Sequence, residues 1–123
     1  LKACITNKLA VTNHLTGLDG RLVYIRSEHA GLNFLLQSAG AIAMKQATVI
    51  LHDALTKDGL IHGRDWAFVA HVHDEFQVEA LPEHVETIKE KSIESIQKAG
   101  ELLGFRCPLD GEAKHGKNWA ETH

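Results

Sequence analysis

The sequence of 123 residues has few of the features of secreted, membrane-spanning or zinc-stabilised proteins. Its two cysteines, Cys4 and Cys107, lie far apart and form no CxxC pair, so they predict neither a zinc knuckle nor a disulfide framework. Two isolated thiols are typical of a reducing compartment. No apolar run approaches the roughly 18 residues of a membrane span, and no signal peptide opens the sequence. We therefore expect a cytoplasmic protein without membrane contact.

Positive charge is also scarce, because 13 Lys and Arg face 16 Asp and Glu and give a net charge of −3. No global basic field attracts nucleic acid, so any DNA contact must come from local groups or from another part of a larger protein. The apolar share of 44% and the length predict one soluble domain, residues 1–123, with one modest core. The first residue is Leu1 rather than Met, which suggests a fragment.

Residues 67–80 predict the β-hairpin around which we expect the fold to be organised. Phe76 and Val78 alternate with polar residues, which is the period of a strand with one buried face. The preceding run, residues 68–72, is more uniformly apolar and predicts a more deeply buried strand. Only a tight turn fits between these two strands.

The expected tip of this hairpin carries His73, Asp74 and Glu75. Adjacent carboxylates at such a tip repel each other and lose hydration unless a cation shares them or one faces solvent. The tip is therefore either a metal site or an ordinary acidic turn, since Asp is a common turn residue. A third interpretation is a metal-dependent hydrolase in which His71 and His73, on one side of a strand, bind Zn²⁺, although no clear third ligand follows.

The rest of the sequence predicts an α+β fold in which two main helices cover one face of a small antiparallel sheet. Gly59 and Gly104 are expected to end these two helices. At least one edge of the sheet is expected to lack a partner. In chain order, the predicted elements besides the central hairpin are the end of a helix within 1–15, a hairpin turning at Asp19-Gly20 with a strand over 22–25, a helix over 27–57, a helix from Pro82 to 103 and a strand over 105–114.

The long helix carries a polar stripe of His29, Asn33 and Gln37, whose spacing of four residues puts their side chains on one face. Such a stripe is ordinarily the solvated edge of a core helix. This one lacks Lys, Glu and Asp, and its members can hydrogen-bond base edges or sugars, which favours nucleic-acid contact. Arg26, beside the first hairpin, is either solvated or a phosphate contact.

These motifs resemble those of family A (Pol I-like) DNA polymerases. Val72-His73-Asp74-Glu75 is similar to the family's motif C, and residues 28–41 resemble the helix that precedes it. The resemblance covers nearly the whole chain and implies the C-terminal part of the polymerase palm. The segments closest to the phage replicative branch and to the family's C-terminus are Gly17-Leu18-Asp19-Gly20-Arg21, Arg26-Ser27, and Gly116-Lys117-Asn118-Trp119 with the terminal His123.

The resemblance implies nucleotide addition by a two-metal mechanism, with primer-template DNA and a deoxynucleoside triphosphate (dNTP) as substrates. Asp74 resembles one of the two catalytic aspartates that hold the Mg²⁺ pair. Glu75 resembles the neighbouring carboxylate that supports the metal and the primer end, and His73 matches the histidine near the primer terminus.

The helical stripe also has counterparts in the family. Asn33 and Gln37 match residues that touch the DNA minor groove near the growing end. His29 lies where the better-known cellular members carry an arginine, so its charge at neutral pH differs from theirs.

The resemblance further implies what these 123 residues do not contain. The family's first metal-binding aspartate and its nucleotide-binding helix, with a lysine and a tyrosine, have no counterpart here. We therefore expect the chain to need the rest of the polymerase polypeptide, to be inactive alone, and to self-associate through its exposed sheet edge. The alternative is a non-catalytic interaction module derived from a palm. If phage-encoded, the protein is expected in the cytoplasm of a bacterial host.

Overall fold

The computed structural model describes residues 1–122, except for the side chain of Glu28. The chain divides into two compact units, Leu1–Ile42 and Ala43–His123, which are described separately. The helix α2 contributes its N-terminal part to the first unit and its C-terminal part to the second. The helices and strands are α1 (Lys2–Thr12), β1 (His14–Thr16), β2 (Leu22–Tyr24), the 3₁₀ helix η1 (Glu28–Ala30), α2 (Gly31–Lys57), β3 (Trp66–Val72), β4 (Glu75–Ala80), the 3₁₀ helix η2 (Pro82–His84), α3 (Val85–Leu102) and α4 (Trp119–Thr122).

The first unit packs α1 and a short hairpin around the beginning of α2. Gly31, the first residue of α2, allows a close approach between the two helices. A Cβ atom at this position would lie 2.8 Å from the Ile5 side chain and 2.9 Å from the Leu9 side chain. The buried cluster consists of Ile5, Leu9, Leu15 and Ile25, with Val23, Leu32 and Leu35 packed against it.

The first hairpin turns at Asp19-Gly20 as predicted, but its loop is longer than two residues. β1 and β2 pair antiparallel and leave residues 17–21 as the loop. Gly20 has a φ of +83°, which glycine adopts without strain. The Asp19 carboxylate accepts the backbone N–H of Arg21 at 3.2 Å and pairs with its guanidinium, and both interactions lower the pKa of Asp19.

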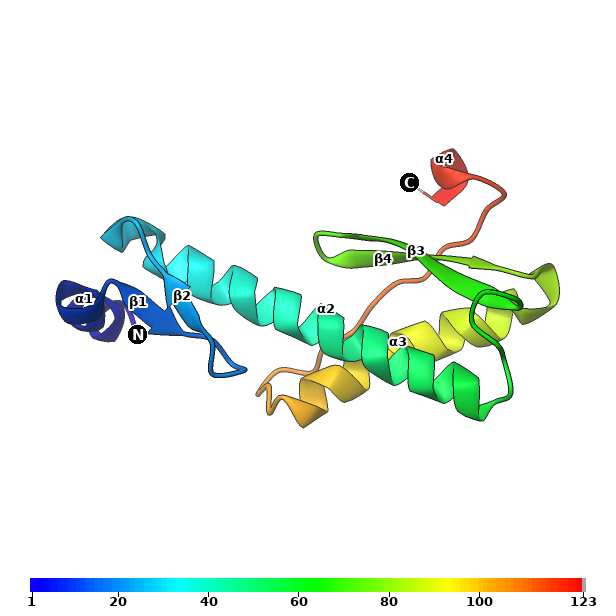
Figure 1. The fold of residues 1–123 in the computed structure, drawn as a ribbon, viewed down its shortest axis with the longest axis horizontal. Helices are drawn as coiled ribbons and strands as arrows, with labels where there is room; N and C mark the ends of the chain where they lie inside the picture. The colour runs from blue at the N-terminus through cyan, green and yellow to red at the C-terminus, as the bar shows by residue number, and fades with distance from the viewer. Residues whose placement is uncertain (123) are drawn as a thin grey trace. The chain divides into compact units, whose positions relative to one another are not determined.

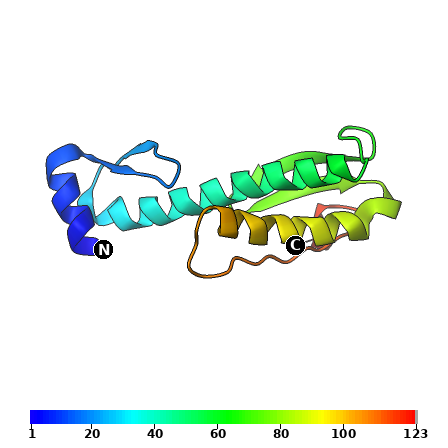
Figure 2. The ribbon, with the colours of Figure 1, turned by 90° about the horizontal axis from the view of Figure 1, so that it is seen from below.

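In the second unit, the C-terminal part of α2 and the helix α3 cover one face of the β3–β4 hairpin (Figures 1 and 2). This arrangement confirms the predicted α+β class with two helices on one face of an antiparallel sheet. Leu51 and Leu55 of α2 are fully buried, one helical turn apart. The core cluster is Leu51, Leu55, Trp66 and Ile88, with Leu60, Phe68, Phe76, Val78 and Ala80 packed against it.

The predicted last strand over 105–114 is wrong, and within residues 43–122 the sheet of the second unit has two strands. The segment is extended and runs along α3 instead. A Cβ atom on Gly100 would lie 2.8 Å from Leu109, and Gln97 Nε2 donates a hydrogen bond to Asp110 Oδ1 at 3.2 Å. An alternating pattern predicts that one side of an extended segment is buried, and a helix surface satisfies that requirement as well as a strand does.

Both long helices end at the predicted glycines. Gly59 has a φ of +85° and Gly104 a φ of +68°, the left-handed conformation of a helix C-cap. At the end of α2, the N–H of Leu60 donates to the carbonyl of Leu55, and the N–H of Gly59 donates to that of Thr56, both at 3.0 Å. These two hydrogen bonds form a Schellman motif.

The helix α2 is long and apolar enough to cross a membrane by length and composition, with a mean hydropathy of 1.3 over an 18-residue window of which 22% is buried. Core helices of soluble proteins pass the same test. Polar residues such as Gln37 and Lys45 interrupt its apolar sequence. Its buried residues Leu51 and Leu55 belong to the core of the second unit.

Candidate functional site

The β3–β4 hairpin ends in a two-residue turn, His73-Asp74, closed by the pair of Val72 and Glu75. The predicted tight turn is therefore confirmed. His73 has a φ of 53°, in the left-handed region that few non-glycine residues adopt but where His is enriched. Asp74 is exposed and forms no hydrogen bond or ion pair with any other described residue. Its carboxylate is therefore available to a ligand.

Glu75 has a more constrained position than Asp74. It is half-buried, and its Oε1 accepts a hydrogen bond from Gln77 Nε2 at 3.1 Å. The two residues are two positions apart on β4 and share a face. The other face of β4 carries Phe76 and Val78, which pack against the core cluster of the second unit. The core thus fixes the strand, and Gln77 orients the carboxylate. No motif in the sequence indicates this role for Gln77.

A β-bulge at Val69 sets the register of the hairpin tip. Phe68 pairs with Val78 and Ala70 pairs with Gln77, so Val69 is an additional residue on β3. Without it, the pairing would shift by one residue and the turn would contain three residues, 72–74, instead of two. The bulge therefore determines that His73 and Asp74 are the turn residues.

The prediction that residues 68–72 form a deeply buried strand is wrong. Val69 is 63% exposed and Val72 is 37% exposed. The bulge changes which side chains face the helices, and the described residues cover only one face of the hairpin. No glycine in this run signals a bulge, so the apolar composition alone is misleading.

Aromatic rings stack edge to face along the helix-facing side of the hairpin. The ring of Phe68 lies 5.0 Å from that of Trp66 and 5.8 Å from that of Phe76. The His71 ring continues the row at 6.5 Å from Phe76. Such T-shaped contacts orient the rings relative to one another as well as burying them. The row stiffens the hairpin up to its tip.

The zinc interpretation of His71 and His73 loses its geometric basis. His71 lies beside Phe76, whereas His73 has left the strand in the left-handed turn, so the two do not share a strand face. Within residues 1–122, no group of three or more His, Cys, Asp and Glu side chains is arranged to hold a metal ion. The carboxylates of Asp74 and Glu75 likewise need a further ligand to complete a metal site.

An ion pair fixes the connection that leads into β3. Arg64 donates to Asp65 through Nε and Nη2, at 2.9 and 2.8 Å, and the backbone N–H of Ile61 donates to the same carboxylate at 2.8 Å. The Arg64 guanidinium first, and then the Ile61 N–H, lower the pKa of Asp65 to about 2. The carboxylate anchors the loop immediately before Trp66, at the base of the hairpin.

The polar stripe belongs to the first unit. His29 lies in η1, and Asn33 and Gln37 follow on α2, all exposed and without a hydrogen bond to another described residue. Arg26 is also exposed, between β2 and η1. The amides of Asn33 and Gln37, one helical turn apart, are therefore both accessible to a ligand.

The comparisons with known proteins agree with the resemblance seen in the sequence. The model of DNA polymerase family A matches residues 7–121. The chain is 46% identical to the DNA-directed DNA polymerase of Enterobacteria phage T3 and 45% identical to that of Escherichia phage T7, in each case over 112 residues. Each alignment covers 89% of this chain and 16% of the relative.

A solved structure has the same fold. The POL domain of Pol1 from M. smegmatis, in complex with DNA primer-template and dNTP, matches with a TM-score of 0.67 and 21% identity over 80% of this chain and 19% of that chain. The chain spans 16% of the length of the phage relatives. Because the family model matches nearly all of its residues, the chain belongs to DNA polymerase family A.

Proposed function

We propose that residues 1–123 form the C-terminal part of the palm of a DNA-directed DNA polymerase, with both units in one domain. In the complete enzyme, this part would serve template-directed addition of dNTP to a primer, in the cytoplasm of the cell. The observation that carries the proposal is the acidic turn, in which Asp74 is exposed and unpartnered at the tip of a hairpin fixed by the core. Membership of the polymerase family supports the assignment.

The donor atoms of the turn fit a hard cation. Mg²⁺ prefers carboxylate oxygens and keeps water and substrate phosphates in its remaining positions. Asp74 would be a direct ligand, and Glu75, oriented by Gln77, would support the metal and the primer end. When bound, the Mg²⁺ pair supplies activation of the primer 3′-hydroxyl and stabilisation of the leaving pyrophosphate.

His73 would act on the primer terminus rather than on the metal. It is one of the two turn residues, in the left-handed backbone conformation, and it is next to Asp74 in the sequence. Backbone conformations of this kind are uncommon for non-glycine residues and concentrate at functional sites. A neutral imidazole can donate or accept a hydrogen bond from the terminal nucleotide.

The stripe in the first unit would examine the newly formed base pair. Purine N3 and pyrimidine O2 are acceptors in the minor groove of every Watson–Crick pair. The side-chain amides of Asn33 and Gln37 can donate to these atoms, and so detect correct pair geometry without reading sequence. His29 and Arg26 would contact the DNA beside them.

The chain alone would be inactive, because its turn provides two carboxylates and the first aspartate of the metal site lies outside these 123 residues. Primer extension in trans tests this proposal. We expect synthesis only when the chain is combined with the remaining polypeptide of a phage relative, and loss of synthesis with Asp74→Asn. Extension by the isolated chain, or by the combined proteins carrying Asp74→Asn, would refute the proposal. Failure of every combination would favour a non-catalytic interaction module.

The β3–β4 sheet also offers a surface for assembly. Among the described residues, the outer edges of β3 and β4 pair with no further strand, apart from a single bridge between Trp66 and His62. Such edges pair readily with other strands, so the isolated chain is expected to self-associate. Sedimentation velocity at rising concentration should show dimers or larger species, and a monomer at all concentrations would count against this.

A further inference from the structure

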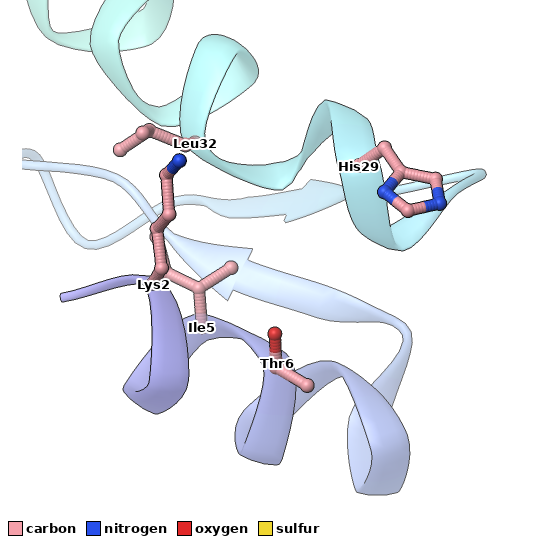
Figure 3. A pocket seen from close by; sticks show the side chains of 5 residues that line it. All are labelled: Lys2, Ile5, Thr6, His29 and Leu32. Atoms are coloured by element: carbon pink, nitrogen blue, oxygen red, sulfur yellow. The ribbon is translucent and has the colours of Figure 1, made fainter.

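A small hollow in the first unit lies between α1 on one side and η1 and α2 on the other (Figure 3). Its volume is about 170 Å³. Ile5 and Leu32 supply apolar wall, and Lys2, Thr6 and His29 supply exposed polar groups. The hollow was not apparent from the sequence, because only the packing of α1 brings its residues next to His29.

The polar groups of the hollow have no partner among the residues that the structure describes. Lys2 Nζ, Thr6 Oγ1 and the His29 ring form no hydrogen bond or ion pair with any other described residue. By contrast, Lys8 on the same helix donates to Thr16 Oγ1 at 3.2 Å. All three unpartnered groups can donate a hydrogen bond, and the ammonium group is always a donor. The hollow therefore suits an anion.

The two units also differ in charge, which the net charge of the whole chain conceals. Residues 1–42 contain four Lys and Arg against two Asp and Glu, whereas residues 43–123 contain nine against fourteen. Net charge therefore favours a polyanion at the first unit over the second. The hollow lies in the unit that favours a polyanion.

The length of the polar stripe indicates which part of a nucleic acid reaches the hollow. From residue 29 to residue 37, a helix rises by about 12 Å, whereas the minor groove of B-DNA is roughly 6 Å wide. If the stripe crosses the groove with Asn33 and Gln37 on base edges, its His29 end would lie over the bordering sugar–phosphate strand. His29 both begins the stripe and lines the hollow.

We infer that the hollow binds a backbone phosphate of duplex DNA, with Lys2 as the counter-charge and the Thr6 hydroxyl as a hydrogen-bond donor. This inference rests on the proposed function, because it takes duplex DNA as the ligand. Lysine and threonine contacts to phosphate fix the position of a protein on DNA and carry no sequence information. The hollow would thus hold the stripe in place on any sequence.

The test is a fluorescence anisotropy titration of the complete chain with a labelled DNA duplex, comparing Lys2→Gln with Lys8→Gln. Both variants lose one positive charge from α1, but Lys8 lies outside the hollow. The logarithm of the affinity falls with the logarithm of the salt concentration, and each phosphate contact adds about 0.9 to the steepness of this fall. If Lys2→Gln loses one contact, the ratio of the affinity of the unmodified chain to that of Lys2→Gln should fall about 3.5-fold between about 50 and 200 mM salt. Lys8→Gln should show less than half of this change. Thr6→Val, of similar size, should weaken binding at both salt concentrations.

Equal losses for Lys2→Gln and Lys8→Gln would overturn the inference, as would absence of duplex binding by the unmodified chain at the lower salt concentration. A Lys2→Gln loss seen with a dNTP but not with the duplex would assign the hollow to a free nucleotide and would also overturn it. The titration measures duplex affinity and not nucleotide addition. Its failure therefore leaves the primer-extension test of Asp74 unaffected, and the two failures are distinguishable.

Discussion

Replacing Gly100 by alanine tests the packing of the segment after α3. A Cβ atom at residue 100 would lie 2.8, 3.1 and 3.2 Å from Cγ, Cδ1 and Cβ of Leu109. These distances are shorter than ordinary van der Waals contact. Because Cβ of Leu109 is one of the crowded atoms, a change of rotamer cannot remove the clash. The backbone of the segment must move away from the helix.

The expected magnitude combines two effects of opposite sign. Overpacking a buried position costs about 1–3 kcal/mol. Alanine in a helix interior is more favourable than glycine by about 0.8–1 kcal/mol. We therefore expect Gly100→Ala to lower the free energy of unfolding by up to about 2 kcal/mol.

Gly40 of α2 provides the matched control, because a Cβ atom there would meet no other atom within 4 Å. Only the helix propensity applies, so Gly40→Ala should raise the free energy of unfolding by up to about 1 kcal/mol. Urea unfolding followed by circular dichroism measures both variants. The two substitutions are chemically identical, and the structure predicts opposite signs for them.

A double-mutant cycle with Leu109→Ala isolates the contact. In that background the clash is relieved, so Gly100→Ala should become neutral or stabilising. A Gly100→Ala variant at least as stable as the unmodified chain, with no coupling to Leu109→Ala, would refute the placement of residues 105–114 along α3.

Three further predictions concern stability. Leu51→Ala, at a fully buried position, should lower the free energy of unfolding in urea titrations by about 2–5 kcal/mol. Val49→Ala, at a position that is 54% exposed, should change it by no more than about 0.5 kcal/mol. Equal effects of the two substitutions would contradict the assigned core. The pKa of Asp65 is depressed from 3.8 to about 2, so the stability that its carboxylate contributes is complete above 3.8 and is lost as the pH falls toward 2. Thermal unfolding of Asp65→Asn should therefore depend less on pH in this range, and an unchanged pH profile would show that the ion pair with Arg64 is absent in solution. His73→Gly should raise the free energy of unfolding by about 1 kcal/mol, because glycine adopts a φ of 53° without strain. A variant that is less stable than the unmodified chain would argue against the left-handed turn.

Local signals in the sequence predicted much of this fold. Gly59 and Gly104 ended the helices, and Asp19-Gly20 formed a turn, because a positive φ is a local requirement that glycine satisfies. Alternation along β4 identified its buried face, since Phe76 and Val78 have no other place to bury apolar surface. These features depend on the residues immediately around them.

The errors arose where tertiary packing decided between equivalent patterns. The alternation over 105–114 fitted a strand, but the surface of α3 accepts the same side chains. The bulge at Val69 left no local signal, because an apolar residue serves equally well inside or outside the strand pairing. The roles of Gln77 and Lys2 likewise depend on neighbours that sequence spacing does not reveal, namely Glu75 in its observed orientation and the hollow beside η1.

We propose that the acidic turn of this chain holds catalytic metal in a family A polymerase. Single-nucleotide incorporation tests this most directly, using the phage T7 DNA polymerase in which this chain replaces the aligned segment of 112 residues. We predict incorporation by this chimera, and a loss of at least about a hundredfold with Asp74→Asn, while Glu83→Gln, an exposed carboxylate on η2, leaves the rate unchanged. A folded chimera that incorporates nucleotides equally well with and without Asp74 would contradict the account.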